Sequence, residues 1–446
     1  MLIFESLRNV FRISELRKRI FFTIGMLVVF RLGSHIPLPE VNPKALEGFQ
    51  EQAKGILGGV FEMAQIFTGG GLGNIAIFGL GIMPYITASI IMQLMTKVSP
   101  TLEAMAKEGP SGQRKISQYT RWLTIPICVL QSIMFIKQIA PVTVEVETSG
   151  GGKEMAGLLL STGFATLAMA VLALTAGAMF IMWLGEQISE YGIGNGASVL
   201  IMSGIVARIV PVMGGMIQQR TDVDRILIVL VIFVGAIVGS VFITQAQRRI
   251  PLQHAKHFRG GRMYGGGGRN YLPLKVNTSG VMPVIFASSL LIVPQILALI
   301  PGLQWIQTSL VPGTFLYSVL YIGMIIFFAY FWTYMFYQPQ EIANNLKEYG
   351  SFLPGIRPGE HTAAYIHGIL SRITLVGALF LCTIALLPDL VAYSMDLTRA
   401  LTGFLGGTGI LIIVGVCLDL VNKIESYLLL HHYKGFTGSG RTRGRR

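Results

Sequence analysis

Side chains that could do chemistry are few in this sequence. Asp419 is the clearest charge inside an apolar run, and Lys423 lies four residues further on, so an intrahelical ion pair is expected there. His431 and His432 stand beside Lys434 in a basic tail, where a solvated pair is expected rather than a metal site. The HExxH, GxSxG and P-loop motifs are absent, as is a pair of intramembrane aspartates. We therefore expect no enzymatic activity, no metal and no cofactor.

The cysteines and one glycine motif point to packing and turns. Cys128, Cys382 and Cys417 all lie in apolar runs without CxxC spacing, so the sequence predicts no disulfide framework. GIGNG at Gly192–Gly196 resembles part of a nucleotide-binding fingerprint, but no βαβ pattern surrounds it. A tight turn between helices is the expected use.

Apolar side chains could act without reactive groups. Ile82 and Ile86 on one helix, Ile285 on a second and Ile412 on the last could form a constriction. Such a constriction excludes water and ions by dewetting, with no need for charged gates. Ordinary helix packing is the alternative interpretation.

The composition places these residues in a polytopic membrane protein. Of 446 residues, 52% are hydrophobic and 13% charged, which is about half the charged share of a soluble protein. The first apolar run lacks a small-x-small cleavage site and is expected to be a retained helix. Ten apolar segments can be drawn, at about 20–37, 74–96, 121–139, 156–184, 195–213, 226–246, 276–300, 313–337, 368–388 and 403–422.

The distribution of positive charge orients these ten segments. The net charge is +13, and most Lys and Arg residues fall in the connections on the same side as the N-terminus. Positive residues accumulate in cytoplasmic loops. Both termini are therefore predicted to be cytoplasmic.

A short stretch of sequence occurs twice. Gly81–Ser89 reads GIMPYITAS and Gly280–Ser288 reads GVMPVIFAS, with Gly, Met, Pro, Ile, Ala and Ser in common. We call these two stretches the echo motifs. Each lies in the second helix of a five-helix half, and with five crossings per half the repeats must face opposite directions. Such inverted repeats place a pathway at the interface between the halves.

The predicted fold is an all-α polytopic membrane protein with ten transmembrane helices. Its two pseudo-symmetric inverted five-helix halves are expected at 1–213 and 226–430, joined by a hinge at 214–225. A basic cytoplasmic tail is expected at 431–446.

A broken membrane crossing precedes the first echo motif. The short amphipathic piece Phe61–Phe67 stops at a glycine cluster, and an apolar run starts at Asn74. Irregular backbone is tolerated in a membrane only where it is buried in protein or lines a water-filled cavity. The amphipathic piece is therefore either a re-entrant helix that packs or a movable stopper.

Two cytoplasmic loops, 247–275 and 338–367, are unusually large. The first carries positive charges throughout and a glycine tip at Gly265–Gly268, so it could contact RNA phosphates or an acidic protein surface. The second sets Arg357 between Pro354 and Pro358, a rigid turn that would present the guanidinium. Solvated loops are the alternative for both.

Six motifs spread over essentially the whole chain resemble the bacterial SecY family, the central subunit of the Sec protein translocase channel. They read FTGGGLGNIAIFGLGIMPYITASIIMQL, KEGPSGQRKISQYTR, MWLGEQISEYGIGNGAS, LPLKVNTSGVMPVIFASS, FLPGIRPGEHTAAYI and LGGTGILIIV. The resemblance implies a multi-pass protein of the bacterial cytoplasmic (inner) membrane. It implies a protein-conducting channel that moves unfolded polypeptides across the membrane and signal or transmembrane helices sideways into it.

The resemblance also implies roles for individual residues. It places a plug half-helix at about 61–74, with a hinge that comprises Phe67, Gly69, Gly70, Gly71 and Gly73. The implied apolar pore ring comprises Ile82, Ile86, Ala197, Ile201, Ile285 and Ile412, where Ala197 departs from the usual bulky aliphatic residue. The implied lateral gate, where a signal sequence intercalates, comprises Thr87, Gln131, Ser289 and Val293. The implied ribosome or motor docking residues are Arg249, Lys256, Arg262 and Arg357, and beyond Tyr264 the loop departs from the family pattern.

The partners implied by the resemblance are the small membrane subunits SecE and SecG, the SecA ATPase motor, the ribosome, signal sequences with their nascent or precursor polypeptides, and membrane lipid. From the residues alone, two other functions remain open. One is a coupled transporter with a five-plus-five inverted repeat. The other is an intramembrane enzyme, which the missing nucleophile and carboxylate pairs disfavour.

Overall fold

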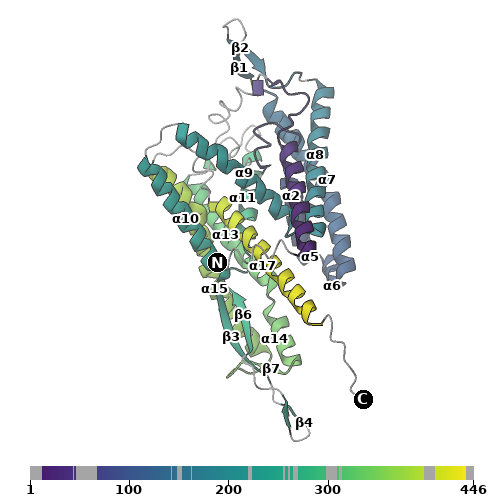
Figure 1. The fold of residues 1–446 in the computed structure, drawn as a ribbon, viewed down its shortest axis with the longest axis vertical. Helices are drawn as coiled ribbons and strands as arrows, with labels where there is room; N and C mark the ends of the chain where they lie inside the picture. Colours follow the sequence, from purple (N-terminus) through teal and green to yellow (C-terminus); the bar gives the residue numbers. More distant parts are fainter. Residues whose placement is uncertain are drawn as a thin grey trace. The chain divides into compact units, whose positions relative to one another are not determined.

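The computed structural model describes residues 13–43, 45–46, 68–141, 143–147, 153–161, 163–218, 223–254, 257–259, 262–264, 270–297, 309–310, 314–395 and 407–437. The described chain is mostly helical and has short β-hairpins (Figure 1). It divides into two compact units, Met1–Arg220 with Val416–Arg446, and Thr221–Gly415.

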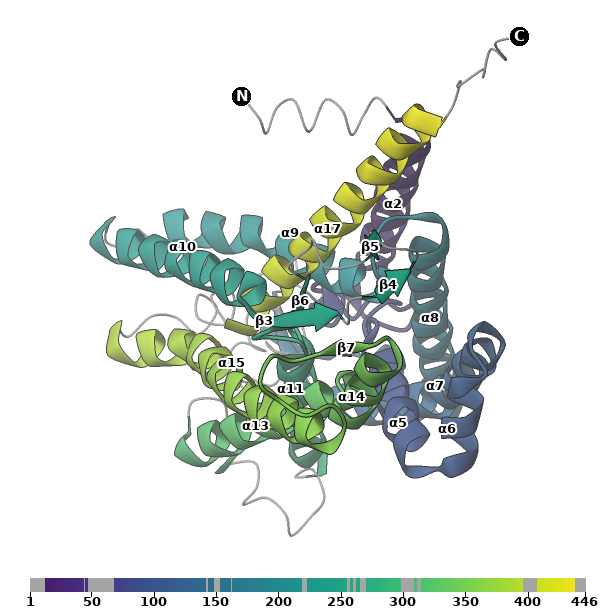
Figure 2. The ribbon, with the colours of Figure 1, turned by 90° about the horizontal axis from the view of Figure 1, so that it is seen from below.

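The first unit is a helical bundle. Its helices are α2 (Ser14–Gly33), α5 (Met83–Val98), α6 (Pro100–Lys107), α7 (Pro110–Ile139), α8 (Phe164–Tyr191) and α9 (Gly196–Gln218). Several of them start with recognisable signals. Pro110 opens α7 directly after Gly109, and the Asn195 side chain caps α9 by accepting from the Ala197 N–H at 3.1 Å. Figure 2 shows α5, α6 and α7 side by side with α8.

The core of the first unit joins α7 and α8 to the segment before α5. Its buried side chains include Ile75, Cys128, Ile136 and Leu174. Small residues allow the backbones to approach closely: Gly196, at the start of α9, lies directly against the Gly185 carbonyl of α8, with no room for a Cβ.

A hairpin of β1 (Thr143–Glu147) and β2 (Lys153–Gly157) connects α7 to α8. The strands are antiparallel, with Thr143 opposite Gly157 and Glu147 opposite Lys153. Next to the hairpin, Val41 forms an isolated bridge with Leu159.

The second unit contains a second helical bundle. Its helices are α10 (Val223–Gln245), α11 (Met282–Leu297), α13 (Phe315–Phe336), α14 (Pro339–Glu348) and α15 (Glu360–Met395), and it also holds the first residues of α17 (Gly407–Thr437). Aromatic side chains join α11 to α13, where the Phe286 ring lies 5.2 Å from Trp332 and 5.6 Å from Phe328 between centroids.

A small sheet packs on the helices of the second unit. Its strands lie in the order β6 (Asn270–Lys275), β3 (Gln247–His254), β7 (Ser351–Phe352), and both pairings are antiparallel. Ile250, Leu274 and Leu353 are buried beneath it against Ile366 and Leu370 of α15. Figure 1 shows this sheet and α14 at one end of α15. A second hairpin pairs β4 (His257–Arg259) with β5 (Arg262–Tyr264).

The structure corrects several expectations. The fold is mostly helical rather than all-α, because both large extramembrane connections contain paired strands. The second span was expected from Asn74, but residues 71–82 form turns and α5 begins only at Met83. Pro84 therefore lies in the first helical turn, where proline is well tolerated, and not in the helix interior.

The described part of the chain contains candidate membrane-spanning helices. Four are long and apolar enough to cross a membrane by length and composition, namely Pro110–Lys137, Phe164–Tyr191, Phe315–Glu348 and Glu360–Leu387. Gly196–Ala207 and Leu230–Gln245 are shorter apolar helices. The hinge predicted at 214–225 overlaps the end of α9 and the start of α10. The predicted amphipathic piece Phe61–Phe67 lies outside the described residues.

Candidate functional site

The stretch from Thr68 to Ile82, called here the turn segment, is held against the end of α2 and the residues that follow it. The Arg31 guanidinium donates to the Gly69 carbonyl at 2.9 Å, and the Asn74 amide donates to the Ser34 carbonyl at 3.2 Å. A backbone hydrogen bond adds to these two contacts. The Ile77 N–H donates to the Ile36 carbonyl at 2.9 Å. The turn segment is therefore a folded, anchored structure rather than a loose linker.

Glycines shape both ends of the turn segment. Gly69 and Gly70 have φ of 65° and 89°, and Gly81 has φ of 58°, a region that side chains with a Cβ rarely adopt. A Cβ on Gly69 would also lie 3.0 Å from the Gly204 Cα of α9. Of the other predicted hinge glycines, Gly71 and Gly73 are buried, and Phe67 lies outside the described residues.

Ile75 is strained in the middle of the turn segment. Its φ is 44° although it is β-branched, and its side chain is fully buried. A left-handed conformation at such a residue costs on the order of 1–3 kcal/mol and persists only where the surroundings fix it. The core around Ile75 supplies that constraint, which sequence reasoning did not foresee.

The first unit holds four of the predicted ring residues, Ile82 and Ile86 at the start of α5, and Ala197 and Ile201 on α9. Ile82 and Ile201 are buried at 2% and 3% exposure, while Ile86 and Ala197 are half-buried. A Cβ on Gly185 would lie 3.4 Å from Ile82 Cδ1 and 3.6 Å from the Ala197 nitrogen. The structure thus brings Ile82 and Ala197 to the same point of α8.

The second unit holds the other two ring residues, Ile285 at 5% exposure and Ile412 at 1%. Ile285 lies in the first turn of α11, and its N–H bonds to the Val281 carbonyl at 3.2 Å. A Cβ on Gly415 of α17 would lie 2.9 Å from Val281 Cγ1. The start of α11 therefore packs against α17 close to Ile412.

The echo motifs have matching local structure. Helices α5 and α11 begin at the corresponding residues Met83 and Met282. Each is preceded by a glycine with positive φ, 58° at Gly81 and 61° at Gly280. The equivalence that the sequence predicted therefore extends to the backbone.

The predicted lateral-gate residues are placed unequally. Thr87 on α5 is half-buried and donates to the Met83 carbonyl of its own helix at 3.1 Å, and Gln131 is half-buried on the adjacent α7. Ser289 and Val293 lie on α11, but their side chains are outside the described set.

Two of the four predicted docking residues have described side chains, and both lie in the second unit. Arg249 is exposed on β3, opposite Pro273 of β6, and Arg357 is exposed in the turn that precedes α15. The Arg357 carbonyl accepts from the Thr362 hydroxyl at 2.9 Å, which fixes that turn. Because β3 pairs with β7, the two large loops form one structural piece. Arg262 lies on β5 without a described side chain, and Lys256 lies outside the described residues.

The described residues contain little reactive chemistry. They include no group of three His, Cys, Asp or Glu side chains that could hold a metal ion. The three cysteines are free, two of them buried. Asp419 and Lys423 are both exposed and form no ion pair with each other. The predicted intrahelical ion pair was therefore wrong. The physical reason is that exposed ion pairs contribute little free energy.

Comparison with known proteins reveals relatives along almost the whole chain. The sequence model of the SecY family matches residues 76–421. The protein translocase subunit SecY of Escherichia coli (strain K12) is 42% identical over 433 residues, which cover 95% of this chain and 94% of the relative. The protein translocase subunit SecY of Streptomyces galbus is 44% identical over 442 residues, which cover 96% and 98%.

Solved structures share the fold at low sequence identity. One described as a protein-conducting channel aligns with a TM-score of 0.63 at 17% identity and covers 93% of each chain. Sec61 in the canine ribosome–channel complex aligns with a TM-score of 0.60 at 17% identity, again over 93% of each chain. With relatives this similar over nearly its full length, the chain belongs to the SecY family of protein translocase subunits.

Proposed function

We propose that this chain forms the protein-conducting channel of a bacterial Sec translocase, through which unfolded polypeptides cross the cytoplasmic membrane and signal or transmembrane helices enter lipid sideways. The observation that carries the proposal is the matched pair of helix starts. Ile82 and Ile86 flank the start of α5, and Ile285 lies in the first turn of α11. A positive-φ glycine precedes each helix start, Gly81 before α5 and Gly280 before α11. Family membership sets aside the enzyme alternative.

The proposed architecture has ten transmembrane helices in two inverted halves, 1–213 and 226–430, with a hinge at 214–225 and both termini cytoplasmic. The repeated helix starts and the positive cytoplasmic loops support it. Inverted repeats place the pathway where the two halves meet. The basic tail at 431–446 belongs on the cytoplasmic side for the same reason.

The gating mechanism follows from the proposed ring and hinge. The apolar ring seals around a moving chain, and dewetting closes it when it is empty. The plug at about 61–74 moves on the glycine hinge, whose anchor on α2 is the Arg31–Gly69 bond. An apolar signal helix leaves through the gate formed by Thr87, Gln131, Ser289 and Val293.

The docking platform is the sheet of the second unit with the turn that holds Arg357. A motor such as SecA, or a ribosome, binds the exposed basic residues of this platform. The small membrane subunits SecE and SecG clamp the helices of the channel from within the membrane. Support for this part comes from the exposure of Arg249 and Arg357 and from the ribosome–channel complex that shares the fold. Binding to RNA phosphates would weaken steeply with salt.

The test places a photo-crosslinker at Ile86, and separately at Ile285, in membranes that hold an export precursor stalled midway. Both positions are expected to label the precursor. Leu172 on α8, which is 67% exposed, provides a matched control that should label lipid or neighbouring subunits instead. If neither isoleucine position labels a precursor that is demonstrably inserted, the pore assignment is wrong and a coupled transporter must be reconsidered.

A further inference from the structure

A polar pocket of about 370 Å³ lies within the first unit, next to the proposed ring residue Ala197. Four helices contribute to its wall, with Tyr85 from α5, Arg121 from α7, Glu186 and Glu190 from α8, and Ala197 from α9. Its other lining residues are Ser117, Gly185, Ser189 and Asn195. The pocket thus joins helices of the proposed lateral gate to the proposed ring.

Two of the pocket's polar groups serve to fix its wall. The Ser189 hydroxyl donates to the Gly185 carbonyl at 3.0 Å and accepts from the Gly196 N–H at 2.8 Å, which ties α8 to α9. The Asn195 side chain caps α9. These groups are therefore occupied by the protein itself.

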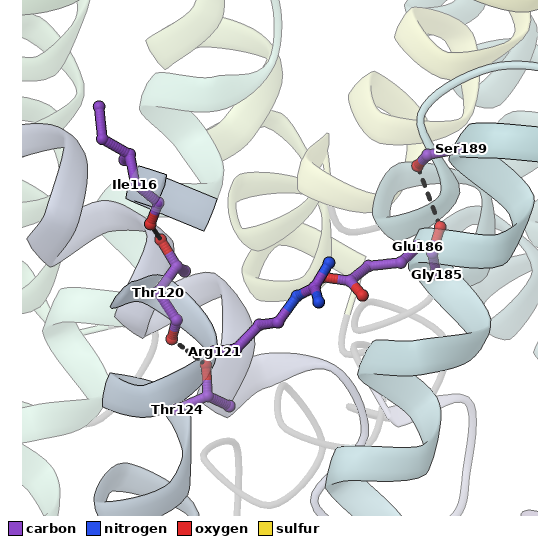
Figure 3. A network of polar contacts seen from close by, with 7 residues as sticks. All are labelled: Ile116, Thr120, Arg121, Thr124, Gly185, Glu186 and Ser189. Atoms are coloured by element: carbon purple, nitrogen blue, oxygen red, sulfur yellow. Dashed lines mark hydrogen bonds and ion pairs between the residues drawn. The ribbon is translucent and has the colours of Figure 1, made fainter. Parts of the chain in front are cut away.

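The charged groups of the pocket do not balance. Arg121 Nε donates to Glu186 Oε1 at 2.7 Å, and Figure 3 shows the guanidinium extended from α7 toward α8. Glu190 is exposed, and its carboxylate forms no ion pair with any described residue. One arginine facing two carboxylates leaves the pocket with a negative charge.

The last turn of α8 and the nearby Arg19 of α2 do not cancel that charge. Glu190 lies in the last turn of α8, which contains no basic residue, and the carbonyl end of a helix is itself partly negative. Arg19 approaches from α2, where its guanidinium donates to the carbonyls of Glu190 and Gly192 at 3.5 and 3.4 Å. The charge of Arg19 is matched by Glu15, 3.8 Å away. A further cation would therefore be favourable in the pocket.

We propose that this pocket binds a lysine or arginine side chain from the positively charged N-terminal region of a signal sequence, with Glu190 as its main counter-charge. The proposal rests on the proposed channel function and on the cytoplasmic placement of the α8–α9 turn. Signal sequences carry basic residues directly before their apolar segment. Once the apolar segment enters the gate beside α5 and α7, those basic residues stay on the cytoplasmic side, where the pocket lies.

The test measures export by the complete translocase of two precursors that differ only in their N-terminal region, one with two lysines and one with two glutamates. Glu190→Lys is expected to slow the lysine precursor about threefold and to speed the glutamate precursor, since one exposed ion pair is worth a few-fold in rate. Glu425→Lys makes the same charge change at an exposed position of α17 outside the pocket. It should leave the ratio between the export rates of the two precursors unchanged. A photo-crosslinker at Ser117 should label the N-terminal region of the lysine precursor.

The outcomes separate the two proposals. If Glu190→Lys and Glu425→Lys give the same ratio between the two precursors, or if Ser117 labels only a motor or ribosomal protein, the pocket does not read the signal charge. If the unmodified translocase exports neither precursor, the channel function itself is refuted.

Discussion

The glycine hinge gives the sharpest prediction, because two adjacent glycines both have positive φ but differ in the space available for a Cβ. Gly69 and Gly70 both have positive φ, so alanine at either position costs about 1–2 kcal/mol. A Cβ at Gly70 meets nothing within 4 Å, whereas a Cβ at Gly69 would lie 3.0 Å from the Gly204 backbone. Forcing α9 to yield adds roughly 1–3 kcal/mol. Gly69→Ala should therefore disturb the turn segment more than Gly70→Ala does.

The assay is ion leakage through the closed channel in liposomes, measured beside the melting temperature of the purified complex. If the cost falls on the closed state, Gly70→Ala raises the open fraction by roughly 5- to 30-fold, because each 1.4 kcal/mol is a factor of ten. Gly69→Ala should raise it further still. Equal leakage from both variants at equal melting temperatures would refute the argument from the Gly204 contact. Unchanged leakage in both would remove the hinge from gating.

Four further predictions concern the anchor, the ring, the docking platform and the core beneath the sheet. Arg31→Ala removes the hydrogen bond from the Arg31 guanidinium to the Gly69 carbonyl, which is worth about 1.5–3 kcal/mol because its donor is charged. Ion leakage should therefore rise at least tenfold. Recovery of the closed state in Arg31→Lys would identify the lost bond as the cause. Ile285→Asn should admit precursors with weak signal sequences and increase ion leakage; unchanged selectivity would count against the ring. Arg357→Glu should slow motor-driven export about tenfold without loss of inserted protein, mainly through slower docking, and normal export would exclude Arg357 from the platform. Leu274→Ala, at a fully buried site on β6, should cost about 2–5 kcal/mol and expose loop 247–275 to protease at lower temperature. Unaltered digestion would show that the sheet does not depend on that core.

The echo motifs were the most informative part of the sequence, and the structure shows why. A glycine that needs positive φ, followed by a proline in the first helical turn, specifies a helix start almost irrespective of its surroundings. Two copies of that signal therefore give two equivalent helix starts, at Met83 and Met282. Local backbone chemistry is what sequence reasoning captures best.

The start of α5 was misjudged because hydropathy does not distinguish a buried turn from a helix. Ile75 and Phe78 are apolar and buried, as a membrane helix would require, yet they belong to the turn segment. The glycines at 71, 73, 79 and 81 were the signal against a helix, since each costs about 1 kcal/mol there. The β1–β2 hairpin had a similar signal in the alternating VEVE stretch followed by glycines.

Arg121 and Glu186 could not have been paired from the sequence. The two residues are 65 positions apart, and their contact depends on how α7 packs on α8. The bond from Arg31 to Gly69 likewise joins a helix end to a turn whose shape only the fold defines. Polar contacts between separate elements are tertiary facts, whereas helix starts are local ones.

The turn segment and the proposed ring are mechanically connected through Gly81. A Cβ on Gly81 would lie 3.0 Å from the Thr68 Cα, so the hinge end of the turn segment packs directly on the residue before Ile82. Ile82 in turn reaches Gly185, beside Ala197. Because a tightly packed interior transmits small shifts rather than absorbing them, a displacement of Thr68 and Gly69 removes the packing that supports Ile82. In a channel built this way, the hinge and the ring in the first unit open together, and a substitution at either one is expected to loosen both.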